Sequence, residues 1–177
     1  MFIHKGIKSE LNFHPVVKKA LTRCIDEMFK IYNVDEIKCR IILSNDSNPN
    51  CTFLSDAVGI TLAEDQDSSD FDSIALGATC DFNNLAQVIF QFSHELTHAI
   101  QHKQKRGLRI EFNLAEMKQK EFPPHHINET EAVANSIYFI ENVFKYTWFN
   151  SRYIQRPDYY DYETAFDWVD SGNFIRQ

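Results

Sequence analysis

Apolar residues recur every three or four positions in two long stretches of the chain. The first stretch begins at Pro15, and proline is favoured at the first position of a helix. The second begins near Asp81 or Asn83, either of which can cap a helix. We predict two amphipathic helices, with apolar faces made of Val17, Leu21, Cys24, Ile25, Met28 and Tyr32 in the first, and of Leu85, Val88, Ile89, Phe92, Leu96 and Ala99 in the second.

Between these helices the pattern changes to alternation, which is typical of strands with one buried face. Polar segments at residues 45–50 and 64–72 separate the alternating runs and predict a turn and a solvated loop. The predicted strands contain, in order, Ile37, Cys39, Ile41 and Leu43; then Val58, Ile60 and Leu62; and then the run Ser73 to Cys80.

A third helical pattern begins at Asn128, and a short helix is predicted around residues 159–169. Because 177 residues are typical of one domain, we predict a single α+β domain that spans residues 1–177. It consists of an N-terminal helix, a small twisted sheet of three or four strands, and two later helices packed on the sheet. The core face of the third helix comprises Ala132, Val133, Ile137, Ile140 and Phe144.

Composition and charge narrow the class of protein. The formal net charge is −7, so we expect no nucleic acid as the main partner. The sequence shows no apolar run of the ~20 residues that a membrane helix needs, and no secretory signal. The four cysteines are scattered without a C-x-x-C pair, which favours buried thiols over a redox or metal role. We therefore expect a cytoplasmic protein that does not bind membranes.

The second predicted helix contains the sequence HELTH, which places His94, Glu95 and His98 on one helical turn. Histidines four residues apart lie on one helix face and can bind a single Zn²⁺. Glu95 lies roughly 100° away around the helix, so it can approach a water on the metal instead of the metal itself. The pattern predicts a zinc site with Glu95 as its general base.

Catalytic zinc takes three protein ligands, so a third ligand is required elsewhere. The metzincin continuation is excluded because Gln101 and Gln104 stand where it needs glycine and histidine. The third helix offers E-x-x-A-N, from Glu131 to Asn135. HExxH followed by E-x-x-A-N resembles the gluzincin metallopeptidases, and most closely their ImmA/IrrE-like group. The resemblance covers roughly residues 73–144 and implies a zincin-like fold.

The resemblance implies a role for each matching residue. His94, His98 and Glu131 are the implied zinc ligands, and Asn135 is implied to support a ligand histidine. A rival interpretation follows from the helix start: with Asn128 as the cap, Glu131 occupies the capping-box position, and Glu129 is then free to bind the metal. The residues Glu131, Asn135, Tyr138 and Asn142 form a polar stripe that needs partners.

These observations predict a zinc-dependent metalloprotease, a hydrolase that acts on a protein or peptide. The resemblance extends this expectation to a regulatory protein as substrate. An extended substrate could pair with the edge of the predicted strand at residues 73–80. Tyr138 and His126 are candidates for stabilising the oxyanion, together with His125, Arg152 and Tyr153. The alternative is a non-catalytic interaction module, in which His125 or His126 closes the coordination of a structural zinc.

Overall fold

The computed structural model describes residues 1–43, 59–63, 72–76, 83–104, 127–146 and 161–175. The helices in this part of the chain are α1 (Pro15–Tyr32), α2 (Leu85–Lys103), α4 (Ile127–Tyr138) and α5 (Tyr162–Ser171), and α4 continues into the π-helical segment η2 (Phe139–Val143). The strands are β1 (Phe2–His4), β2 (Ile7–Ser9), β3 (Cys39–Leu43), β4 (Gly59–Ala63) and β5 (Asp72–Leu76). The predicted α+β class is confirmed.

Local sequence explains where the first two long helices begin and end. Pro15 is the first residue of α1, as predicted, and the His14 side chain caps the helix by accepting a bond from the Val16 N–H. Asn33 ends α1 in the left-handed conformation, with φ 52°. Helix α2 is capped by Asn84, one residue after Asn83 and three after Asp81, the two candidate caps, and the Asn84 side chain accepts a bond from the Gln87 N–H.

The sheet begins with a hairpin that the sequence patterns did not predict. Strands β1 and β2 pair in antiparallel fashion and are joined by Lys5 and Gly6, which both have positive φ. Two such residues form the tight turn that matches the twist of paired strands. A Cβ atom at Gly6 would collide with the backbone of Ile37, so glycine is also required sterically there. The described sheet therefore has five strands, not three or four.

The strand order in the sheet is β1-β2-β3-β5-β4. Strand β3 pairs in parallel with β2 and β5, while β4 pairs with β5 in antiparallel fashion. Strand β5 thus has a partner on each side, and the prediction that it offers a free edge to a substrate is wrong. The edge next to β5 is formed by β4. Residues 77–80 of the predicted strand lie outside the described residues.

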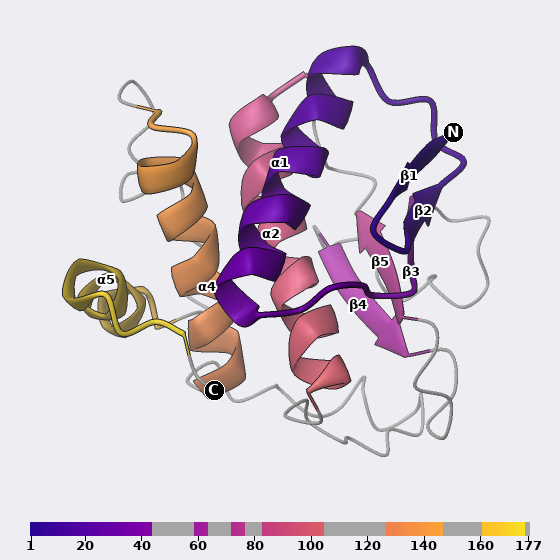
Figure 1. Cartoon of the computed structure of the whole chain (residues 1–177). Helices are drawn as coiled ribbons and strands as arrows, with labels where there is room; N and C mark the ends of the chain where they lie inside the picture. The colour runs from indigo at the N-terminus through magenta and orange to yellow at the C-terminus, as the bar shows by residue number, and fades with distance from the viewer. Residues whose placement is uncertain (44–58, 64–71, 77–82, 105–126, 147–160, 176–177) are drawn as a thin grey trace, which may run out of the picture.

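Helix α2 occupies the middle of the molecule (Figure 1). It packs on β4 and β5 on one side and on α4 on the other, while α1 lies beside it and α5 covers the far side of α4. The apolar faces predicted for α1 and α2 are buried in the main core, except that Leu85 is half-buried at its edge and Ala99 is buried outside it. None of the described helices combines the length and apolar character needed to cross a bilayer.

Candidate metal centre

Helix α2 holds His94 and His98 one turn apart on the side that faces α4. Their Nε2 atoms lie 3.2 Å apart, and their rings meet edge to face, with centroids separated by 4.8 Å. Two ligands of one tetrahedral ion at ~2.0–2.1 Å are separated by about 3.3 Å. The spacing of these two nitrogens therefore matches that of a pair of zinc-type ligands.

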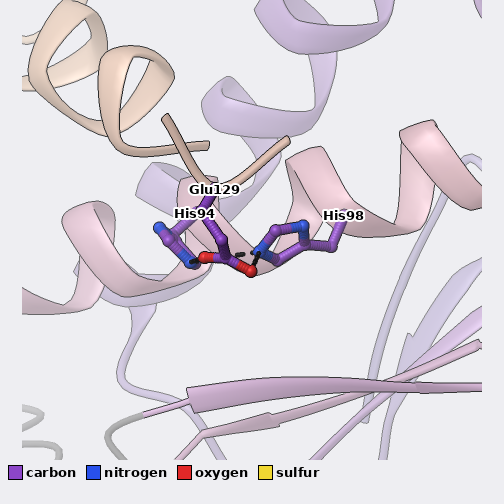
Figure 2. Close-up of side chains that lie close together, drawn as sticks. All are labelled: His94, His98 and Glu129. Carbon is purple, nitrogen blue, oxygen red and sulfur yellow. Dashed lines mark hydrogen bonds and ion pairs between the residues drawn. The ribbon is translucent and has the colours of Figure 1, made fainter. Parts of the chain in front are cut away.

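Helix α4 brings Glu129 to this pair. Its Oε2 lies 3.4 Å from Nε2 of His94, and its Oε1 lies 3.3 Å from Nε2 of His98. Figure 2 shows the carboxylate between the two imidazole rings. One ligand atom from each residue lies within 4.8 Å of the others, and the three side chains are only 8–20% exposed. This cluster, the His94–His98–Glu129 triad, is largely buried and could hold a metal ion.

Small residues let α2 and α4 approach closely enough for the triad to form. The Ser136 hydroxyl donates to the carbonyl of Phe90 at 2.8 Å and lies 3.4 Å from the Ser93 hydroxyl. Both serines are fully buried, and Ala132 next to them is also buried. Larger side chains at these positions would separate the helices and move Glu129 away from the histidines.

Glu131, the ligand implied by the resemblance, lies outside the triad in this structure, and its role as a ligand stays a prediction. Its Oε1 accepts a 2.6 Å bond from the Tyr32 hydroxyl, and its Oε2 accepts a 3.1 Å bond from Nε2 of Gln101. Two helical steps rotate Glu131 roughly 200° from Glu129, so both residues cannot face the histidines together. Of the alternative in the sequence analysis, the structure shows one part, which is that Glu129 is the carboxylate beside the histidines. Helix α4 begins at Ile127, so Asn128 lies inside the helix instead of at the expected cap position.

Asn135 also differs from its implied role. Its amide donates to the Tyr32 hydroxyl at 2.7 Å and to the Glu131 carbonyl at 3.0 Å, and it contacts neither histidine of the triad. A residue that does contact a triad histidine is Gln101, whose Oε1 lies 2.9 Å from Nδ1 of His98. Sequence reasoning missed this role, although Gln101 lies three residues after His98 on the same helix face.

Of the two main candidates for oxyanion stabilisation, Tyr138 lies away from the triad and His126 lies outside the described residues. The Tyr138 ring packs 4.6 Å from that of Phe174, between the core and α5. It also lies about 13.5 Å along the helix axis from Glu129, at 1.5 Å per residue, so its position does not suit a role beside the triad. His126 lies outside the described residues, as do the further candidates His125, Arg152 and Tyr153.

The predicted base, Glu95, is buried on α2 next to the first histidine, with 5% of its surface exposed. Its negative charge acts on the other histidine, because it helps to raise the pKa of His98. This places the Glu95 carboxylate within electrostatic range of the triad. Its role as a base stays a prediction.

The triad is strongly coupled electrostatically. Burial lowers the pKa of His98, but the hydrogen bond and charge of Glu129, with the charge of Glu95, outweigh burial and raise it to about 9. Burial likewise disfavours the charged form of Glu129, yet the bonds from His94 and His98 hold its carboxyl pKa far below the usual range. Without a metal, the cluster is thus an ion pair between a histidinium and a carboxylate.

This coupling predicts how the stability of the metal-free protein changes with pH. The folded pKa of His98 lies above its ordinary value of 6.5, so its contribution is fully present below about pH 6.5 and is lost as the pH rises towards 9. The contribution of Glu129 is present above pH 4.5 and is lost as the pH falls further. We expect the free energy of unfolding, measured in urea, to decrease from pH 6.5 to 9.

Two variants and one ligand check this pH dependence. A His98→Gln variant should lack the decrease, and a His102→Ala variant, which leaves the triad intact, should keep it. Zinc should reverse the trend, since a metal needs the neutral imidazole and therefore binds more tightly as the pH rises. A decrease of equal size in His98→Gln would assign it to other groups.

A further prediction concerns the hydroxyl of Tyr32. Tyr32→Phe removes the donor to Glu131 and the acceptor for Asn135, and both of these groups are fully buried. We expect a loss of about 1–3 kcal/mol in the unfolding free energy, the usual cost of unsatisfied buried polar groups. Urea unfolding of the metal-free protein measures it.

The matched control is Tyr138→Phe. The Tyr138 ring packs on Phe174, and within the described part of the chain its hydroxyl forms no hydrogen bond. The same chemical change should therefore cost little there. Equal losses in the two variants would contradict the role given to the Tyr32 hydroxyl.

Comparisons with known protein families, with characterised proteins and with solved structures found no match to this chain. The metal-binding geometry of the triad therefore stands on the residues themselves.

Proposed function

We propose that this chain is a zinc-dependent metalloprotease with a zincin-like arrangement of its site. The observation that carries the proposal is the convergence of His94, His98 and Glu129 on one point between α2 and α4. Two imidazoles and one carboxylate are a donor set typical of catalytic zinc, which keeps its fourth position open. The HELTH sequence adds Glu95 at the position of a general base.

Each described residue has a task in this proposal. When bound, zinc supplies Lewis-acid polarisation and lowers the pKa of water. Glu95 accepts a proton from the attacking water and returns it to the leaving amine. Gln101 holds the His98 ring in place through its side-chain contact, and the packing of α2 on α4 holds the ligands of the two helices together. The site is almost closed to bulk solvent. The substrate is a protein or peptide, with a regulatory protein as one option, and the site of action is the cytoplasm.

Two features distinguish this pattern from an accidental pair of histidines. The triad is largely buried where α2 packs on α4, a place where apolar side chains would otherwise be favoured. In addition, the second helix contributes a carboxylate, as in the gluzincin arrangement that the sequence resembles. The contributing residue is Glu129 instead of Glu131, so the likeness extends to the type of ligand and its helix but not to its register.

The experiment compares protein termini in cells that express the wild type or Glu95→Gln. New termini that appear only with the wild type support proteolysis and identify the substrate. Identical termini, together with a fourth protein ligand on zinc in the purified protein, would support a non-catalytic interaction module with a structural zinc. Purified protein without bound zinc, and without affinity for it, would remove the basis of the proposal.

A further inference from the structure

The side-chain amide of Gln101 is held in one orientation by three contacts, two of them buried and one partly buried. Its Nε2 donates to the backbone carbonyl of Asn128 at 3.0 Å and to Oε2 of Glu131 at 3.1 Å. Both of these partners are acceptors, so the NH₂ end must face α4. The oxygen end consequently faces α2, where it lies 2.9 Å from Nδ1 of His98. Gln101 itself is 1% exposed, so water does not compete for these bonds.

This orientation determines which ring nitrogen of His98 keeps its proton when the ring is neutral, as metal binding requires. A neutral imidazole has one N–H, and an amide oxygen can only accept. The bond therefore requires the proton on Nδ1 and leaves the lone pair on Nε2. That nitrogen is the one that lies 3.2 Å from Nε2 of His94 and 3.3 Å from the Glu129 carboxylate. The bond to Gln101 thus leaves Nε2 of His98, which faces the rest of the triad, available as a metal ligand.

The contacts behind Gln101 extend to a third helix. Glu131 on α4 accepts from the hydroxyl of Tyr32 at the end of α1, and Asn135 donates to that same hydroxyl. Glu131 and Asn135 are fully buried, and Tyr32 is 3% exposed. The orientation of the Gln101 amide is therefore fixed by groups from α1 and α4 as well as by its own helix.

We propose that Gln101 is a positioning residue that sets the tautomer of His98, and that Glu131 sets the orientation of Gln101. The inference rests on the proposed zinc site and assigns a function to Gln101 and Glu131, two buried polar side chains outside the triad. Hydrogen bonds to the second nitrogen of a ligand histidine fix its ring and increase its basicity, and their loss typically weakens metal affinity about 10–100-fold.

The test measures the zinc dissociation constant of Gln101→Met by competition with a chelator. Methionine keeps a similar length and volume but accepts no strong hydrogen bond, so we expect zinc to bind ~10–100-fold more weakly. Gln91→Met is the matched control, because Gln91 is also buried on α2 and its Oε1 has no hydrogen-bond partner among the described residues. The control should bind zinc within about 2-fold of the wild type, as it removes no contact to a ligand.

A spectroscopic measurement on the wild type separates positioning from a merely structural role. Nitrogen-15 NMR of the zinc-loaded protein should show a slowly exchanging proton on Nδ1 of His98 and the metal on Nε2. The same proton should exchange rapidly in Gln101→Met. A wild-type spectrum with the proton on Nε2 would overturn the proposal, even if the variant did not fold.

The outcomes also distinguish this inference from the proposed function. Equal zinc affinity in Gln101→Met and Gln91→Met would overturn the positioning role and leave the zinc site intact. Absence of zinc binding by the wild type would instead reject the site as a whole. Weaker binding in Gln101→Met alone, with loss of the protected proton, would support both.

Discussion

Glu95→Gln should retain zinc and lose hydrolysis by ~10²–10⁴-fold, which is the usual contribution of a positioned general base. Glutamine has nearly the same shape as glutamate but cannot take a proton from water. Because Glu95 lies outside the triad, the metal ligands stay in place. Cleavage of a substrate found by the comparison of termini measures the rate, and elemental analysis measures the zinc.

Removal of this buried charge has a second effect that serves as an internal control. The Glu95 carboxylate helps to raise the pKa of His98, so this pKa should fall in the metal-free variant. A variant that folds, binds zinc and keeps full activity would show that another group takes the proton. Loss of zinc together with activity would show that Glu95 helps to hold the site, and the assignment as a base would then be wrong.

Glu129→Gln should weaken zinc binding by more than about 100-fold, because loss of a ligand should exceed the ~10–100-fold cost of losing a supporting partner. The variant removes the only described carboxylate of the triad and its negative charge. Glu131→Gln should have a smaller effect of about 10-fold, since Glu131 is connected to the triad through its bond with Gln101. Glu163→Gln, an exposed position on α5, controls for the change in net charge.

The relative size of these two effects decides between two registers of α4. A larger loss in Glu131→Gln than in Glu129→Gln would restore the ligand implied by the E-x-x-A-N pattern. The arrangement of α2 and α4 described above would then have to rotate when zinc binds. Equal affinity in both variants and the wild type would exclude any carboxylate ligand from α4.

The long helices could be predicted because their evidence is repeated many times along the sequence. Six apolar positions define one face of α1 and six others define one face of α2, so a single residue that does not fit leaves the prediction unchanged. The hairpin had no comparable signal, since β1 and β2 have three residues each and their turn contains lysine before glycine. Such short strands are stabilised by their partners in the sheet and not by their own pattern.

The site was predicted in part for a similar reason. The i, i+4 spacing of His94 and His98 is a property of one helix, and it can be read without knowing the fold. The choice between Glu129 and Glu131 depends on how α4 is rotated against α2, which periodicity alone does not determine. Tyr32 was assigned to the core because its ring belongs there, although its hydroxyl reaches Glu131.

The bond between Tyr32 and Glu131 joins residues 99 positions apart in the sequence. Closing so long a loop costs conformational entropy, and contacts of this kind form slowly compared with the turns of a single helix. During synthesis, the two histidines emerge before Glu129, so the three residues of the triad can come together only after α4 has left the ribosome. In the proposed site, metal coordination can therefore be completed only after α4 has been synthesised, and it would report that α2 and α4 have packed together.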